Sequence, residues 1–205
     1  MSSCRIDIYR HAESASNAGE KTAWPDTIPL TIHGRRQAED LARSIAVYPT
    51  RLVSSPFLRS SETLMPIARR FPDAGRETWE VQEFTYLQPE ACVGTSWKER
   101  KPRIDAYWRE LDPDFVDGPG AESFRQLLKR ASDFLDRLTK LSDGPTLVVS
   151  HGQFIQATLL LAENADIDAG VAMRLFIERQ HLSPFENCER LQLSFDAGRL
   201  SPARG

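Results

Sequence analysis

Two histidines lie just after short segments that are typical of buried strands. Arg10 and His11 follow residues 4–9, which alternate in polarity and are rich in Ile and Tyr. His151 follows residues 146–150, whose centre is apolar. In open α/β sheets, ligands bind at the carboxyl ends of the strands. We therefore expect His11 and His151 to meet in one site.

Two further strand ends add charged side chains. The strand expected over residues 51–55 leads to Arg59, and the strand expected over 77–82 ends beside Glu83. Guanidinium groups bind phosphate oxygens through paired hydrogen bonds and keep their charge near neutral pH. A neutral imidazole can accept a phosphoryl group, and a carboxylic acid can protonate a leaving oxygen and then activate water. Two arginines, two histidines and a carboxylate thus fit a phosphate dianion.

The elements that must position these residues alternate along the chain. We expect helices over about 32–46, 57–70, 96–111, 124–141 and 153–162, and strands over 4–9, 51–55, 77–82, 146–150, 174–178 and 190–195. The tail from Asp196 is expected to be frayed. Strands that alternate with helices imply an α/β fold, here a three-layer α/β/α sandwich with a mainly parallel sheet. Residues 1–205 are interpreted as one domain.

Residues 84–120 lack the regular pattern of the rest of the chain. They hold several aromatic residues among many charges. We expect them to form a cap over the strand ends, with Trp97 and Tyr107 contacting the leaving group of a substrate. The basic residues of this segment favour a solvated face, with binding of an anionic substrate as the alternative: Lys98, Arg100, Lys101 and Arg103.

Composition narrows the class of protein. With 40% hydrophobic and 27% charged residues, the chain has the composition of a soluble globular protein. A net charge of −3 argues against nucleic acid as a partner, and the sequence contains no apolar segment long enough to span a membrane. Because the first strand begins almost at once, we expect no signal peptide and a cytoplasmic location. Cys4, Cys92 and Cys188 form no CxxC pattern, so they are interpreted as small buried residues without structural zinc.

Five short motifs in chain order resemble the histidine phosphatase superfamily, which is also called phosphoglycerate mutase-like. They are Arg10-His11-Ala12-Glu13-Ser14 with Asn17; Thr22-Ala23-Trp24-Pro25-Asp26; Pro29-Leu30-Thr31 with Gly34, Gln37 and Ala38; Ser54-Ser55-Pro56 with Arg59 and Thr63; and Val149-Ser150-His151-Gly152. Each motif alone is weak, because short patterns recur by chance. Together, at these spacings, they are specific and cover nearly the whole chain.

The resemblance implies a role for each matching residue. His11 would be the nucleophile that forms phosphohistidine, and Glu83 the proton donor, with Glu80 and Glu90 as neighbouring candidates. The phosphate pocket would be formed by Arg10, Arg59 and His151, and the substrate would be bound by Asn17, Thr22 and Gly152. Asn17 and Thr22 are also typical of residues that only shape a loop.

The family requires neither a metal ion nor another cofactor. It commonly has Gly where this chain has Ala12, which would be strained if the position needed a positive φ.

The function implied is a metal-independent phosphomonoester hydrolase of the phosphatase branch. One alternative is a phosphoglycerate mutase or sugar bisphosphatase on the same scaffold, and another is a non-catalytic phospholigand-binding protein. The mutase branch carries a Glu-Arg-His-Tyr-Gly pattern at the catalytic carboxylate, whereas residues 83–87 here contain neither a basic residue nor a glycine. The expected partner is a small phosphorylated substrate, with a phosphoprotein as a further option. The physiological substrate and the oligomeric state stay open.

Overall fold

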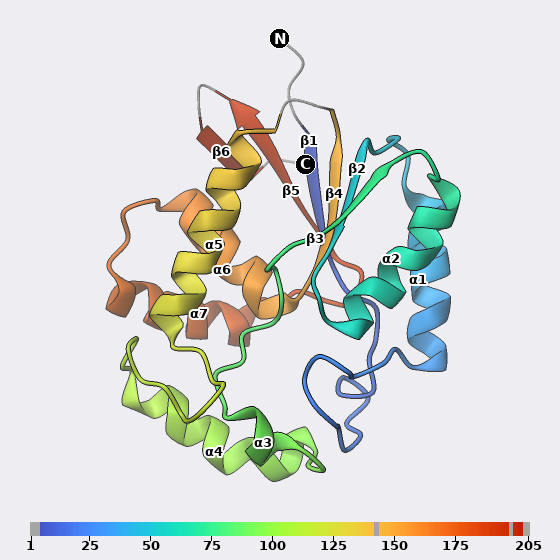
Figure 1. The fold of residues 1–205 in the computed structure, drawn as a ribbon. Helices are drawn as coiled ribbons and strands as arrows, with labels where there is room; N and C mark the ends of the chain where they lie inside the picture. The colour runs from blue at the N-terminus through green and yellow to red at the C-terminus, as the bar shows by residue number, and fades with distance from the viewer. Residues whose placement is uncertain (1–4, 142–143, 197–198, 203–205) are drawn as a thin grey trace.

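The computed structural model describes residues 5–141, 144–196 and 199–202. The described strands are β1 (Arg5–Arg10), β2 (Arg51–Ser54), β3 (Gly75–Thr78), β4 (Thr146–Ser150), β5 (Arg190–Asp196) and β6 (Arg199–Pro202). The described helices are α1 (Ile32–Ser44), α2 (Leu58–Arg70), α3 (Pro89–Cys92), α4 (Trp97–Glu110), α5 (Phe124–Thr139), α6 (Gly152–Glu163) and α7 (Ala169–Leu182). Figure 1 shows their arrangement.

The strands form one sheet in the order β3-β2-β4-β1-β5-β6. The first four strands pair in parallel, whereas β5 runs antiparallel to β1 and β6 antiparallel to β5. This confirms the α/β fold with a mainly parallel sheet. Because β2, β4 and β1 are parallel neighbours, the segments that follow them leave the sheet at the same edge, where the His11 amide donates to the Ser150 carbonyl at 2.9 Å.

Helices cover both faces of this sheet, as expected for three layers. Figure 1 shows α1 and α2 on one face and α5, α6 and α7 on the other. Alternate strand residues supply the two cores: Ile8 and Val148 pack with the second group of helices, and Tyr9 and Val149 with the first. The buried apolar area on both faces fixes the register of the parallel strands, since a slip by one residue would turn every side chain to the wrong face.

The helix starts follow local capping signals. The Thr31 hydroxyl accepts from the Gly34 amide at 2.9 Å, and Ser96 and Ser123 each form a capping box with the residue three positions later. Gly34 is also required by space, because a Cβ there would lie 1.9 Å from the Glu13 carbonyl oxygen. Helix α1 therefore packs directly against the loop that follows His11.

The strand expected over 77–82 is wrong in its bounds, because β3 ends at Thr78. Residues 79–82 leave the ladder, because the chain bends at Glu80 and the Val81 amide donates to the Trp79 carbonyl at 2.8 Å. Instead, the Val81 carbonyl accepts a hydrogen bond from the Ser150 hydroxyl at 2.7 Å. This contact carries the chain across the end of β4 toward the site.

The strand expected over 174–178 is also wrong, because these residues belong to α7. The Asp168 carboxylate caps this helix by accepting from the amides of Gly170 and Val171. The buried positions Ala172, Met173 and Phe176 have helical spacing. A strong cap and burial on one face thus outweigh the local strand propensity of the apolar run around Phe176.

The tail expected to fray contains β6, which pairs with β5. Leu200 is buried in the larger core, so burial rather than local propensity accounts for this strand. Residues 197–198 lie outside the described part of the chain.

The segment 84–120 contains α3 and α4, which lie beyond the carboxyl ends of the strands in Figure 1. It is joined to the loop after β1 by a bridge, in which the Thr22 amide donates to the Thr95 carbonyl at 3.1 Å. Tyr107 is only 3% exposed and packs among Tyr86, Trp108 and other aromatic rings. None of the helices in the described ranges is long and apolar enough to cross a membrane.

Candidate active site

His11 is buried at the end of β1, and its two ring nitrogens have different partners. Nδ1 lies 2.7 Å from the Ala12 carbonyl oxygen, which can only accept, so Nδ1 carries the proton. Nε2 accepts a hydrogen bond from Nε of Arg59 at 3.1 Å and therefore holds the lone pair. Burial, together with the charges of Arg59 and Arg10, holds the pKa of His11 well below its ordinary value. His11 is thus a neutral imidazole with a nucleophilic Nε2.

His151 is buried at the end of β4, with its ring centroid 4.9 Å from that of His11. Its Nε2 is hydrogen-bonded to the Ser55 hydroxyl at 2.7 Å, and the same hydroxyl accepts from the Phe57 amide. Nδ1 is buried and has no hydrogen-bond partner among the described residues. Burial, followed by the charge of Arg59, lowers the pKa of His151. Ser55 therefore fixes the ring and leaves Nδ1 for a ligand.

Two arginines supply positive charge beside these rings. Arg59, near the start of α2, is 6% exposed, donates from Nη1 to the Pro25 carbonyl at 2.7 Å and lies over the Phe57 ring. Burial lowers the pKa of Arg59 to about 10, so it is still charged at neutral pH. Arg10 donates from Nη1 to the Phe185 carbonyl, while its buried Nε has no partner in the described ranges.

A cavity of about 360 Å³ brings most of the predicted site residues together. Its lining includes five of them, namely Arg10, Thr22, Arg59, Glu83 and Gly152. The two buried histidines adjoin it, because His11 is bonded to Arg59 and the His151 ring lies 5.3 Å from that of Phe57. The segment 84–120 contributes further lining residues, among them Tyr86, Trp97 and Arg100.

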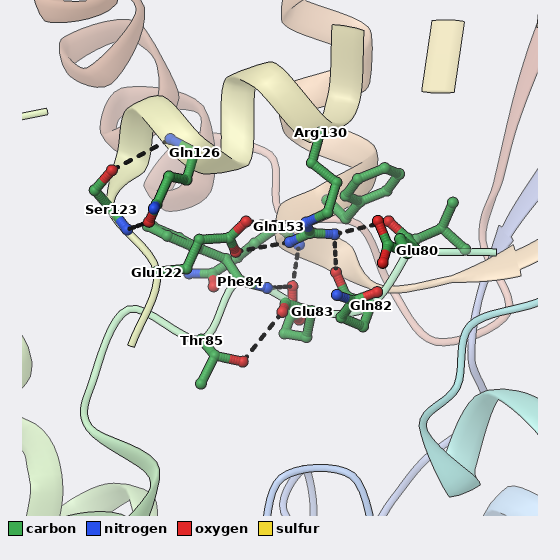
Figure 2. Close-up of polar contacts among 12 residues, drawn as sticks. Glu80, Gln82, Glu83, Phe84, Thr85, Glu122, Ser123, Gln126, Arg130 and Gln153 are labelled. Carbon is green, nitrogen blue, oxygen red and sulfur yellow. Dashed lines mark hydrogen bonds and ion pairs between the residues drawn. The ribbon is translucent and has the colours of Figure 1, made fainter. Parts of the chain in front are cut away.

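Glu83 enters the cavity from the loop beyond β3. Its Oε1 accepts hydrogen bonds from the amides of Phe84 and Gln153, each at 3.1 Å (Figure 2). Of the three carboxylates considered from the sequence, Glu83 lines this cavity, whereas the exposed Glu80 and Glu90 do not. Glu83 also borders a more open groove of about 910 Å³ along α5.

Arg130 on α5 holds the loop that presents Glu83. Figure 2 shows its guanidinium between Glu122 and the carbonyls of Glu80 and Gln82. It donates to those carbonyls at 3.2 and 2.8 Å and to the two carboxylate oxygens of Glu122 at 2.9 and 2.7 Å. The guanidinium thus joins the helix to the backbone on both sides of residue 81.

Thr22 and Asn17, which were expected to line the pocket, differ in their placement. Thr22 lines the cavity and accepts a hydrogen bond from Arg100 at 3.1 Å. Asn17 is exposed and absent from the lining. Its side-chain oxygen accepts from the Ser14 amide at 3.1 Å and from Asn187 at 3.3 Å. Asn17 therefore shapes the loop after His11. Tyr107, expected to contact a leaving group, is likewise absent from the lining and buried.

The Ala12 position carries no strain, because it is not among the described non-glycine residues with positive φ. Its amide donates to the Thr63 hydroxyl at 3.0 Å.

Three residues with contacts at the site were not assigned a role from the sequence: Ser55, Arg130 and Asn187. Ser55 belongs to the motif Ser54-Ser55-Pro56, so the sequence could have indicated a role at the site. The other two depend on contacts between distant segments.

Within the described ranges, no cluster of three or more His, Cys, Asp or Glu side chains is suited to hold a metal ion. Cys92 is buried and Cys188 is half-buried, and both are free thiols. Cys4 lies outside the described residues.

Comparison with curated proteins finds relatives along most of the chain. A metal-independent phosphoserine phosphatase of Arabidopsis thaliana is 27% identical over 183 residues, which cover 86% of this chain and 76% of that protein. A bifunctional protein of Mycobacterium tuberculosis is 32% identical over 184 residues, covering 87% of this chain. The match spans about half of that protein's length (49%).

Solved structures share the fold at lower identity. A mycobacterial glucosyl-3-phosphoglycerate phosphatase matches with a TM-score of 0.73 at 20% identity, covering 98% of this chain and 97% of that one. A phosphoserine phosphatase of Entamoeba histolytica, in complex with phosphoserine, matches with a TM-score of 0.74 at 21% identity, covering 98% and 95%. These similarities confirm the three-layer fold.

A family model described as the histidine phosphatase superfamily, branch 1, matches residues 6–192. The matched range runs from β1 into β5 and so includes both histidines at the strand ends. The predicted class, a phosphatase with a nucleophilic histidine, is thereby confirmed. The chain belongs to the histidine phosphatase superfamily.

Proposed function

We propose that this protein hydrolyses small phosphate monoesters through a phosphohistidine on Nε2 of His11, without a metal ion. The observation that carries the proposal is the orientation of that ring. The Ala12 carbonyl accepts a hydrogen bond from Nδ1–H, and the guanidinium of Arg59 lies 3.1 Å from Nε2. A phosphoryl group at Nε2 would therefore meet a lone pair and a fixed cation together. The phosphatases named among the relatives support hydrolysis rather than mutase activity.

In the first step, the Nε2 lone pair attacks phosphorus in line with the leaving oxygen. The N–P bond forms as the P–O bond to the leaving group breaks, and the Glu83 carboxylic acid gives its proton to that oxygen. Arg10, Arg59 and Nδ1–H of His151 donate to the equatorial oxygens. Support for the last role is that the Ser55 hydroxyl can donate to Nε2, which leaves the ring proton on the unpartnered Nδ1.

In the second step, water attacks the phosphorus of phosphohistidine. The Glu83 carboxylate takes a proton from that water as the N–P bond breaks. Inorganic phosphate then leaves, and the lone pair returns to Nε2 of His11. Two backbone amides hold Oε1 of Glu83, so we assign both proton transfers to Oε2. The open groove on the other side of Glu83 offers water a route to this oxygen.

The organisation of the chain belongs to the same proposal. Residues 1–205 are one domain, and residues 84–120 are its cap, which is supported by the contribution of Tyr86, Trp97 and Arg100 to the cavity lining. A cytoplasmic location is proposed on the cysteine pattern, which shows no pairing typical of a secreted disulfide framework. Gly152 is proposed to lie against bound phosphate, because a Cβ at this position would lie 3.5 Å from the Nε of Arg10.

The test is to trap the intermediate on the native protein. Incubation with ³²P-labelled phosphoserine and rapid quenching should leave phosphate on the protein that is stable in base and labile in acid, and mapping should place it on His11. The matched control is the exposed His181 on α7, which should carry no label. Release of inorganic phosphate without a labelled protein, or label on another residue, would contradict this mechanism.

A further inference from the structure

The cavity holds more positive charge than a phosphate group needs. Three arginines and one carboxylate line it among the described residues: Arg10, Arg59, Arg100 and Glu83. Two arginines match the charge of a phosphate dianion. Arg100 is therefore an additional cation in a pocket that already has a complete phosphate site.

Arg100 differs from the basic residues next to it on α4. Lys101 is paired with Asp105 at 2.7 Å, and Arg103 with Asp117 at 2.7 Å. Arg100 has no acidic partner within ion-pair distance in the described ranges. Arg100 lines the cavity, so its positive charge faces the cavity without a carboxylate at ion-pair distance among the described residues.

The contacts of Arg100 fix its guanidinium at the join between the cap and the loop after β1. Nε donates to the Ser96 carbonyl at 3.2 Å, and Nη2 donates to the Thr95 carbonyl and the Thr22 hydroxyl, both at 3.1 Å. All of these acceptors are neutral. The guanidinium is therefore held in place before a ligand arrives, while Nη1 has no hydrogen bond in the described structure.

The other arginines approach the cavity from different elements. Arg10 is the last residue of β1 and Arg59 lies in the first turn of α2, so both lie near the strand ends beside His11. Arg100 comes from the cap, together with Trp97 and Tyr86. In the proposed mechanism the leaving oxygen lies beside Glu83, which lines the same cavity next to the cap, so Arg100 faces the alcohol part of the substrate.

We propose that Arg100 binds a carboxylate on the leaving group, and that the preferred substrates are phosphate monoesters of hydroxy acids or hydroxy amino acids. This inference rests on the proposed phosphatase function. The two free N–H groups of Nη1, beside neutral acceptors, suit a monovalent carboxylate, whereas a second phosphate dianion would leave charge unmatched. A carboxylate held at Nη1 also orients the ester for in-line attack.

The experiment compares substrates that differ only in this group. 3-Phosphoglycerate is paired with glycerol 3-phosphate, and phosphoserine with phosphoethanolamine, with phosphate release as the readout. The wild type should prefer the carboxylate in each pair by at least about tenfold in kcat/KM. In Arg100→Gln that preference should fall to within about threefold, mainly through a higher KM, and Arg100→Lys should keep part of it.

Lys101→Gln is the matched control, because it removes one positive charge from the same helix at an exposed position outside the cavity. It should leave the preference unchanged. A preference that persists in Arg100→Gln, equal losses on both members of each pair, or a wild type without any preference would overturn the proposal. Failure of the wild type to hydrolyse even p-nitrophenyl phosphate would instead contradict the phosphatase function itself.

Discussion

The histidines and the carboxylate of this site are held by different kinds of structure. His11 and His151 follow two adjacent parallel strands, are at most 2% exposed, and are hydrogen-bonded to Arg59 on α2 and to Ser55 after β2, respectively. Glu83 is half-buried on a loop after the edge strand, and its position depends on backbone amides and on Arg130. Strand pairing thus places the proposed nucleophile, whereas backbone amides and Arg130 place the proposed proton donor.

The two regions also differ in access. The buried histidines contact Arg59 and Phe57, respectively, which line the 360 Å³ cavity, while Glu83 borders both this cavity and the 910 Å³ groove. Changes to the buried pair should therefore act on phosphoryl transfer to or from every substrate. The effect of changes around Glu83 should depend on how strongly the leaving group requires protonation. The ratio of kcat/KM between an alkyl phosphate and p-nitrophenyl phosphate separates these effects, because p-nitrophenolate leaves without protonation.

The largest effect is expected from His11→Ala. Loss of the nucleophile should lower kcat/KM by at least about 10⁴-fold on both phosphoserine and p-nitrophenyl phosphate. Phosphate binding should persist, because Arg10 and Arg59 are intact, and calorimetry can measure it. His181→Ala, at an exposed position, is the control for the purification and assay. Near-native turnover by His11→Ala would refute the role of the sheet edge in catalysis.

Glu83→Gln should give a loss that depends on the substrate. Without a proton donor, kcat/KM for phosphoserine should fall by roughly 10²- to 10⁴-fold, while that for p-nitrophenyl phosphate should fall far less. Glu80→Gln is the control, since Glu80 is exposed and does not line the cavity. If both substrates lost activity equally, Glu83 would not be the proton donor, and the contrast with the histidines would disappear.

Arg59→Lys tests the buried side again, with a smaller change. Lysine keeps the charge but loses the planar fork, so the transition state for both substrates should lose roughly 2–4 kcal/mol, measured from kcat/KM. The losses should be equal, because this arginine holds the transferring group. Arg69→Lys on the exposed side of the same helix should have no effect. Unchanged kinetics in Arg59→Lys would place the phosphate elsewhere.

Arg130→Lys tests the loop without touching a residue of the cavity. An ammonium group can keep the pair with Glu122 but cannot reach all the acceptors of the guanidinium. Glu83 should then be less well placed, with a loss on the order of tenfold on phosphoserine and little change on p-nitrophenyl phosphate. Arg137→Lys on the same helix, which pairs with Glu77, is the matched control. Equal losses on both substrates would indicate a general loss of structure.

The sequence predicted the buried side of the site better than the exposed side, for a physical reason. Arg10, His11 and His151 follow strands that their own residues specify, and parallel topology then brings those strand ends together. The same rule for strand ends predicts the position of Arg59, which comes shortly after β2. These residues needed no knowledge of side-chain contacts between distant segments.

Arg130 and Arg100 could not be assigned in this way. Arg130 acts through acceptors about 50 positions away, and nothing local distinguishes it from other helix-surface arginines. The basic run around Arg100 was interpreted mainly as a solvated face, which fits Lys101 but not the cavity-lining Arg100. For Asn17 substrate binding stays a prediction: its side-chain oxygen accepts from the Ser14 amide, and a polar loop residue beside a motif can bind either a ligand or its own backbone.

The smallest effect we expect is on stability, and it concerns the histidine pair alone. Folding lowers the pKa of both histidines well below 6.5, so the unfolded chain binds more protons than the folded one as pH falls. Burying the two histidines in the neutral form therefore does not lower the free energy of unfolding above about pH 6.5, and it does lower it below that pH. Each histidine should reduce the free energy of unfolding by about 0.7 kcal/mol between pH 7 and pH 6. Urea unfolding at the two pH values measures this change. The substitutions His11→Asn and His151→Asn should each remove one share of it, and an unaltered pH dependence in the double variant would mean that other groups cause it.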